Sequence, residues 1–129
     1  MSIPSQFHKK KYINLQTYRK NGEGVRTPVW FVEHDEKLYV ITMADSWKVK
    51  RIRREKRVQV APCQVNGRVI GEWQIAEACE TNETGLMEIV NGLYRKKYGL
   101  LNRIYEKQRI KKGNASVTLE INITNDLSK

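Results

Sequence analysis

The residues best suited to chemistry in this sequence are a serine and the cations that closely follow it. Asp45 or Ser46 can cap a helix that runs through Lys56, with Lys48 in its first turn. The amino terminus of a helix offers free N–H groups and the positive end of its dipole. Arg26, on a neighbouring predicted strand, can add a bidentate guanidinium. These residues outline a phosphate site, although a solvated basic helix with Ser46 as an ordinary cap fits the same pattern.

Three tryptophans are the second feature relevant to binding. Trp30, Trp47 and Trp73 each carry a flat apolar ring on which a planar ligand can stack. For Trp30, packing in a small core is the favoured interpretation. Trp47 stands among charged residues at the start of the basic helix. A large apolar ring is unusual in a turn that only faces solvent. Trp47 is therefore the better candidate for a ligand contact.

Side chains typical of acid–base or nucleophilic catalysis are scarce. His8 falls near the N-terminus and His34 in a predicted turn, and neither has a nucleophile at a recognisable spacing. There is no phosphate loop, GxSxG or GxGxxG motif. Cys63 and Cys79 stand apart, without the clustered ligands that a metal site needs. We expect no metal and no catalytic side chain, so a cofactor would supply the chemistry of any reaction.

Length and charge limit the class of protein. The chain has 129 residues and a formal charge of +10, from 24 Lys and Arg against 14 Asp and Glu. Residues 48–57 sum to +6 and residues 95–112 to +7, which leaves −3 for the rest of the chain. No uncharged run approaches the ~20 residues of a membrane span, and the N-terminus lacks the pattern of a signal peptide. We expect one domain over residues 1–129, in the cytoplasm, with an anionic partner and no membrane.

Hydrophobic patterning predicts mainly strands. Strands are expected at residues 11–20, 26–33, 37–43, 57–65, 68–80 and 116–124. Asn21-Gly22 and Asn66-Gly67 predict hairpin turns, and the first three strands suggest a meander. Helical spacing follows at about 45–56 and again from about 84, where Gly99 breaks the second helix. The order βββ-α-ββ-α-β indicates a small antiparallel barrel.

Four segments in combination resemble a known family. They are RTPVWF at 26–31, LYVIT at 38–42, SxKVKRxRR at 46–54 and RVxV at 57–60. Together they resemble the pyridoxamine 5′-phosphate oxidase-like flavin-binding split-barrel superfamily, and within it the short subgroup of deazaflavin-dependent oxidoreductases. The resemblance implies a mainly β (α+β) fold, an antiparallel Greek-key split β-barrel with two or three helices. It also implies a homodimer that binds FMN or the 8-hydroxy-5-deazaflavin coenzyme at the subunit interface.

The resemblance assigns roles to particular residues. Arg26 and Thr27 match ring-edge and phosphate contacts of the family. Phosphate ligands fall on Thr42, Ser46 and Lys48, and Arg51 is a weaker match. Val29 is a backbone contact to the ring, and Trp73 is placed to reach the ring bound by the partner subunit. Trp47 stands where the pyridoxamine phosphate oxidases have arginine, so we do not expect oxidation of vitamin B6.

Three functions are compatible with these features. The first is hydride transfer between FMN or a deazaflavin and an unidentified organic substrate. The second is binding of single-stranded nucleic acid, for which a basic barrel with interleaved aromatics is typical, although the aromatics here are dispersed. The third is a cofactor or ligand carrier on the same barrel, without turnover. The basic stretch 95–112 fits either the binding of a polyanionic cofactor tail or a solubilising face.

Overall fold

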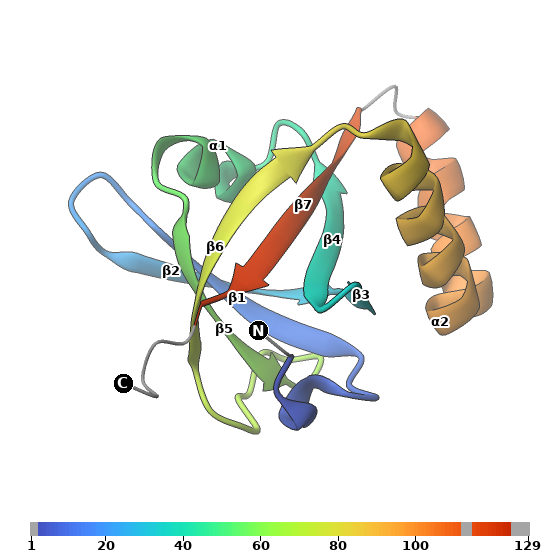
Figure 1. Cartoon of the computed structure of the whole chain (residues 1–129). Helices are drawn as coiled ribbons and strands as arrows, with labels where there is room; N and C mark the ends of the chain where they lie inside the picture. The colour runs from blue at the N-terminus through green and yellow to red at the C-terminus, as the bar shows by residue number, and fades with distance from the viewer. Residues whose placement is uncertain (1–2, 112–114, 125–129) are drawn as a thin grey trace.

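Seven strands and two helices make up the fold (Figure 1). The computed structural model describes residues 3–111 and 115–124. The strands are β1 (Tyr12–Tyr18), β2 (Gly24–Trp30), β3 (Val32–His34), β4 (Lys37–Met43), β5 (Arg57–Cys63), β6 (Gln74–Thr81) and β7 (Ser116–Ile123). The helices are α1 (Trp47–Arg54) and α2 (Thr84–Lys111), and a short 3-10 turn, η1, covers Ser5–Phe7. In the described part, no helix is both long and apolar enough to cross a membrane.

The sheet closes on itself at Phe31. Its strand order is β2-β1-β5-β6-β7-β4-β3, with every pair antiparallel. The two edge strands β2 and β3 are halves of one bent strand, because Trp30 pairs with Tyr12 of β1 while Val32 pairs with Tyr39 of β4. The predicted meander is confirmed: the expected strand at 26–33 pairs with β1 through its β2 half and with β4 through its β3 half. The bend directs the fully buried Phe31 ring into the core, edge-on to Phe7 with centroids 6.5 Å apart.

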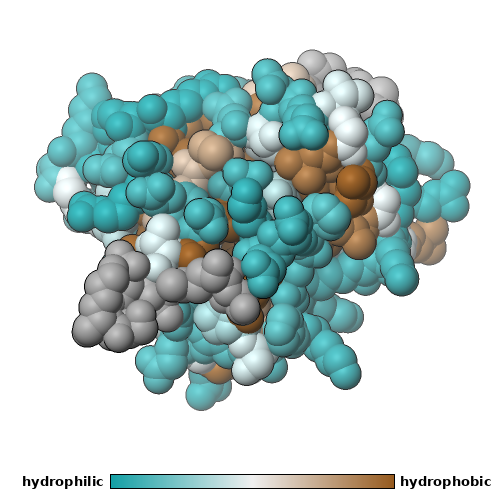
Figure 2. Space-filling view, viewed as in Figure 1, coloured by the Kyte–Doolittle hydropathy of each residue, from teal (hydrophilic) through white to brown (hydrophobic). Residues whose placement is uncertain are grey.

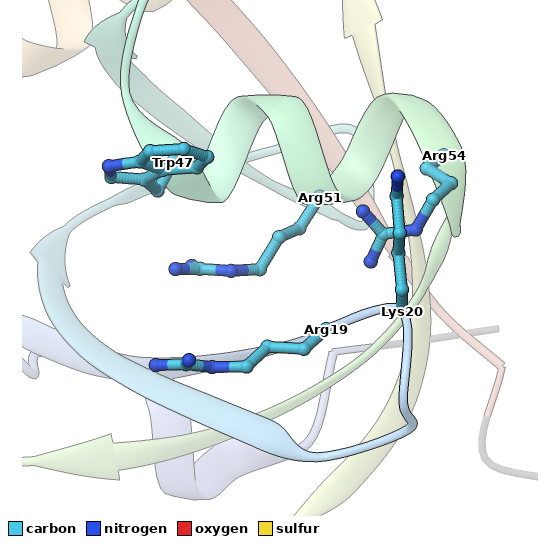
Figure 3. Close-up of a pocket in the computed structure, with 5 residues that line it drawn as sticks. All are labelled: Arg19, Lys20, Trp47, Arg51 and Arg54. Atoms are coloured by element: carbon cyan, nitrogen blue, oxygen red, sulfur yellow. The ribbon is translucent and has the colours of Figure 1, made fainter.

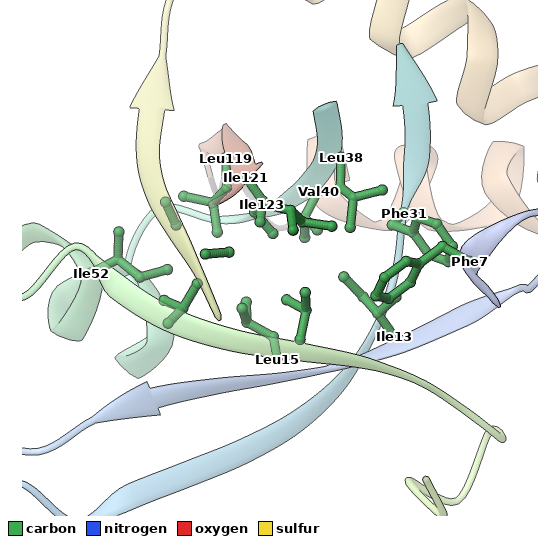
Figure 4. Packing of buried hydrophobic residues seen from close by; sticks show 14 of the residues in the cluster. Phe7, Ile13, Leu15, Phe31, Leu38, Val40, Ile52, Leu119, Ile121 and Ile123 are labelled. Carbon is green, nitrogen blue, oxygen red and sulfur yellow. The ribbon is translucent and has the colours of Figure 1, made fainter. Parts of the chain in front are cut away.

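Alternate residues of the strands fill the barrel. Ile13 and Leu15 of β1 point into the same space as Leu38 of β4 and Leu119 and Ile121 of β7, and all five are fully buried (Figure 4). This alternation is the period-2 pattern from which the strands were expected, and the predicted strand at 116–124 is confirmed by β7.

The chain between β5 and β6 differs from the prediction. The turn at Asn66-Gly67 is confirmed, with Gly67 at φ 89°. The expected strand over 68–80 is too long, because β6 begins only at Gln74 and Trp73 stands just before it. Gly71 is not a strand bulge: a Cβ there would lie 2.6 Å from the Pro62 side chain, so the backbone passes too close for any other residue. Val69 still pairs with Cys63 of β5, and the Ile70 N–H donates to the Pro62 carbonyl oxygen at 2.9 Å. Further along, the Gln6 amide bonds both backbone groups of Glu72 and holds this part of the segment beside η1.

Helix α2 is a hairpin of two helical segments. Gly99 has φ 57° and ψ −128°, which confirms the predicted break. The second segment returns alongside the first (Figure 1), and Arg95 lies 3.7 Å from Glu106 across the pair. The first segment packs Val90 and Tyr94 against Val32 and Tyr39 on the outer face of the barrel, in a second hydrophobic cluster.

Two tyrosine hydroxyls of α2 bind the backbone at the bend. The Phe31 N–H donates to the Tyr98 hydroxyl at 2.9 Å, and that hydroxyl lies 2.8 Å from the carbonyl oxygens of Lys11 and Phe31. The Tyr94 hydroxyl accepts from the Ile41 N–H at 2.9 Å and donates to the Trp30 carbonyl at 2.8 Å. Burial raises the pKa of Tyr98, so its hydroxyl stays protonated. The hydroxyls thus supply hydrogen bonds to backbone groups around the bend in the strand.

Removing the Tyr98 hydroxyl should destabilise the fold measurably. In Tyr98→Phe the buried Phe31 N–H loses its acceptor, which costs about 1–3 kcal/mol. The matched control is Tyr105→Phe, because that ring also lies against Trp30 but is about half exposed. Urea unfolding of both variants measures the difference. Equal loss of unfolding free energy in the two would contradict the role given to Tyr98.

Candidate functional site

A cationic hollow lies between α1 and the hairpin that joins β1 to β2. Its volume is about 470 Å³, and it is lined by Arg19, Lys20, Trp47, Arg51 and Arg54. Figure 3 shows the flat groups of Trp47, Arg51 and Arg19 in successive layers, with Lys20 and Arg54 at the far end of the helix. Four of the five lining residues are cations and none is acidic. We call this site the α1–hairpin hollow.

Helix geometry places three of these residues on one side of α1. Trp47, Arg51 and Arg54 are spaced four and three residues apart and so share a face. The opposite face carries Val49 and Ile52, which are buried in the barrel core and so anchor α1 to the barrel. The predicted Asn21-Gly22 turn, with Gly22 at φ 88°, folds the β1–β2 hairpin and thereby positions Arg19 and Lys20.

Two hydrogen bonds join α1 to β1. The Arg54 Nη2 donates to the carbonyl oxygen of Tyr18 at 2.5 Å. The Arg51 Nη1 donates to the hydroxyl of the buried Thr17 at 3.3 Å. These bonds leave further N–H donors on each guanidinium. Such donors are suited to an anion bound in the α1–hairpin hollow.

The cations of the hollow repel one another. Burial, with the neighbouring charges of Arg19 and Arg54, lowers the pKa of Arg51. Arg19 has Glu23 at 3.3 Å, but among the described residues no carboxylate pairs with Lys20, Arg51 or Arg54. An anion with more than one charge would relieve this repulsion.

Ser46 and Lys48 lie at the start of the same helix. Ser46 is the N-cap residue, as predicted, but its side chain makes no capping hydrogen bond. Its Oγ is buried and has no hydrogen-bond partner in the described part of the chain. Lys48 is half-buried, and this burial, with the charge of Arg51, lowers its pKa. A hydroxyl without a partner and an uncompensated ammonium are both suited to a phosphate group.

Three of the predicted site residues on strands, Thr27, Val29 and Thr42, face the interior of the barrel. Thr27 and Val29 pair with Leu15 and Ile13, so they lie on the barrel side of β2. Thr42 of β4 is also buried, opposite Val117. These three side chains line the barrel rather than its outer surface.

Arg26 lies on the outer side of β2 and contacts Trp73. Its guanidinium carbon is 4.7 Å from the centre of the Trp73 ring, and its Nε donates to the Gln16 Oε1 at 2.8 Å. The predicted residues therefore form three groups in the described structure: Arg26 with Trp73, the barrel-lining Thr27, Val29 and Thr42, and the residues along α1. No described contact joins the first of these groups to the last.

Trp30 packs within the fold, as predicted. Its ring stacks on Tyr98 at a centroid distance of 4.1 Å and an interplanar angle of 6°. Trp47 differs: it is 69% exposed, and its main described contact is the Lys50 ammonium, 4.6 Å from the ring centre. The structure thus leaves the Trp47 indole open to a ligand.

Arg19, Lys20 and Gln74 were missed from the sequence. Arg19 and Lys20 precede the Asn21-Gly22 turn, which was predicted, but their position against α1 depends on a contact distant in sequence. Gln74 follows Trp73, and its buried Oε1 has no hydrogen-bond partner among the described residues. No motif in the sequence marks Gln74 as a binding residue.

The other described hollows each include a carboxylate in their lining and lack an indole. One, of about 320 Å³, is lined by His8, Glu33, His34 and the turn that follows, and His8 pairs with Glu33 at 2.7 Å. In residues 3–111 and 115–124, no three or more His, Cys, Asp or Glu side chains form a group that could hold a metal ion. The α1–hairpin hollow is therefore the candidate site.

Inorganic phosphate should stabilise the protein through this hollow. A ligand that binds only the folded chain raises the free energy of unfolding, by about 2.7 kcal/mol at one hundred times its Kd. We expect a phosphate-dependent rise of a few degrees in the melting temperature. The double variant Arg51→Gln/Arg54→Gln should lose most of that rise. The control Lys11→Gln/Arg68→Gln, with the same change in net charge at exposed positions, should keep it, and a loss in both would contradict the assignment.

Known structures share this fold at low sequence identity. No protein-family model matches the chain, and no curated protein matches its sequence. HutZ, the haem storage protein of Vibrio cholerae, is 13% identical with a TM-score of 0.66, over 89% of this chain and 82% of its own. A FAD-binding protein of Mesorhizobium loti is 16% identical with a TM-score of 0.63, over 93% of this chain and 84% of its own. A candidate pyridoxamine 5′-phosphate oxidase from Listeria innocua is 15% identical with a TM-score of 0.56, over 90% of each chain.

These likenesses confirm the fold that the sequence resemblance implied. Proteins with this barrel include a flavin-binding protein and a haem storage protein. The closed seven-stranded sheet with α1 and α2 is a mainly β split barrel. The chain has the pyridoxamine 5′-phosphate oxidase-like split-barrel fold.

Proposed function

We propose that this chain binds FMN or the 8-hydroxy-5-deazaflavin coenzyme and uses it to transfer hydride to or from an organic substrate. The α1–hairpin hollow carries the proposal, since it combines four cations with an exposed indole. The cofactor phosphate would lie among the cations, with its ring directed toward Trp47. Both cofactors carry a phosphate group and a flat tricyclic ring, so they share this chemistry.

The residues present fit such a cofactor. Arg51 and Arg54 offer guanidinium donors, and neither is neutralised by a carboxylate among the described residues. Ser46 adds a hydroxyl that the described protein leaves unbonded, and Lys48 a half-buried ammonium. Arginine forks and helix N-termini are common ligands of phosphate. The indole of Trp47 supplies the flat apolar surface that a ring needs.

The protein's own contribution is binding and orientation. A bound flavin or deazaflavin supplies hydride transfer, which no side chain can perform. Arg51 and Arg54, held by their bonds to Thr17 and Tyr18, would anchor the phosphate end. Arg26, held by Gln16 and Trp73, would present its remaining N–H donors to the ring edge. No acid–base residue is required for these steps.

The proposal includes a homodimer. The Arg26 and Trp73 pair lies apart from the α1–hairpin hollow, so one chain presents the ring-edge and phosphate residues as separate groups. A second copy that supplies Trp73 to the ring would complete the site, as the sequence resemblance implies. The cofactor would then be shared between subunits.

Storage of a cofactor without turnover is the second candidate. The lining of the hollow holds cations and an indole but no carboxylate or histidine. HutZ, which shares the barrel, is a haem storage protein. Anaerobic mixing of the reduced, bound cofactor with a quinone separates the two functions. Reoxidation faster than that of the free reduced cofactor supports catalysis, and equal or slower reoxidation supports storage.

Neutralising the hollow should weaken cofactor binding. Each guanidinium bonded to a phosphate contributes about 1.5–3 kcal/mol, so Arg51→Gln/Arg54→Gln should raise the Kd for FMN or deazaflavin by at least about a hundredfold. Quenching of cofactor fluorescence on titration with protein measures the Kd. The Lys11→Gln/Arg68→Gln control should bind within about threefold of wild type. Wild-type protein that takes up neither cofactor would refute the proposed function.

A further inference from the structure

The reversal of α2 leaves an apolar tip exposed. Leu100 is 69% exposed, Leu101 57% and Ile104 45%, and none of them belongs to either hydrophobic cluster of the described structure. They follow Gly99, whose positive φ turns the helix back on itself. The face of the molecule seen in Figure 2 is mostly hydrophilic. The barrel does not cover this tip, so its exposure needs an explanation.

Cations surround the tip. A hollow of about 590 Å³ lies at the reversal, lined by Arg95, Gly99, Leu100, Arg103 and Glu106. Glu106 is the acidic member, and it is already engaged, 3.7 Å from Arg95 and accepting a hydrogen bond from Asn102 at 2.8 Å.

More positive charge lies beside the tip. Lys96, one turn before Leu100 on the first α2 segment, is exposed. Lys107 of the second segment is exposed as well. Around the apolar tip, positive charge therefore exceeds negative charge.

We propose that the α2 tip docks on a membrane surface rich in anionic phospholipid. Leucine and isoleucine side chains at the tip would enter the boundary between headgroups and acyl chains, while Arg95, Arg103 and Lys107 face the lipid phosphates. This contact is peripheral, so it differs from the membrane span that the sequence argues against. The tip lies on the opposite side of the barrel from α1 and the β1–β2 hairpin (Figure 1), so docking leaves the candidate site accessible.

A second copy of the chain is a poorer occupant. A stable protein interface buries about 800 Å² on each partner, far more than the three apolar side chains of the tip provide. Two such tips would also bring their arginines and lysines together, and like charges oppose association. A membrane surface has neither limitation, because it is extended and negatively charged.

Sedimentation with vesicles tests the proposal on the full chain. We expect binding to vesicles containing about a third phosphatidylserine, much weaker binding to pure phosphatidylcholine, and a steep fall as salt rises. Leu100→Gln/Leu101→Gln and Arg103→Gln/Lys107→Gln should each weaken binding by about tenfold or more. Val65→Gln/Ile70→Gln removes equally exposed apolar side chains elsewhere, and Lys11→Gln/Arg68→Gln removes equal charge, and both should bind like wild type.

Three results would overturn the proposal. One is equal binding to the two kinds of vesicle. Another is a loss of vesicle binding that is equal in the tip variants and in their controls, which would indicate attraction by net charge alone. A third is a smaller particle mass for Leu100→Gln/Leu101→Gln than for wild type in the absence of lipid, which would assign the tip to a second copy. Titration of the same variants with cofactor measures the proposed function separately. A negative result with vesicles therefore does not count against the proposed function.

Discussion

Closure of the sheet at Phe31 is the constraint on which the rest of the structure depends. A seven-stranded antiparallel sheet would end in two exposed edges if β2 and β3 did not share one bent strand. The bend buries the Phe31 ring and directs the neighbouring backbone groups toward α2, where Tyr94 and Tyr98 bond them. Helix α2 therefore helps close the barrel, and the barrel in turn fixes the base on which α1 and the β1–β2 hairpin lie.

Helix α1 and the β1–β2 hairpin, which lie on this barrel, bring four cations close together. This concentration of positive charge favours the binding of an anion. Burial of Val49 and Ile52 presses α1 onto the core, and this packing brings Arg51 and Arg54 toward Arg19 despite their mutual repulsion. Hydrophobic burial of two such side chains contributes roughly 3–6 kcal/mol, enough to offset repulsion between partly solvated charges. The core thus stabilises an arrangement that a bound phosphate would complete.

Much of the fold was predictable from the sequence, and part of the site was not. Alternating residues in β7, the Asn21-Gly22 turn and the break at Gly99 are local signals, and the structure confirms all three. The division of the expected strand 26–33 into β2 and β3 and the late start of β6 depend on long-range contacts, those of Phe31 with Phe7 and Tyr98 and that of Gln6 with Glu72. Arg19 and Lys20 escaped notice for the same reason. Position along the chain says nothing about which helix a hairpin faces.

The most direct test of the account compares FMN with riboflavin, which has the same ring but no phosphate. If the cations of the α1–hairpin hollow hold the phosphate, FMN should bind the wild-type chain at least about a hundredfold more tightly than riboflavin, because several charge-assisted hydrogen bonds are lost with the phosphate. Fluorescence titration with both compounds at one salt concentration gives the ratio. Equal affinity for the two would contradict the account, since the cations of the hollow would then have no part in binding the cofactor.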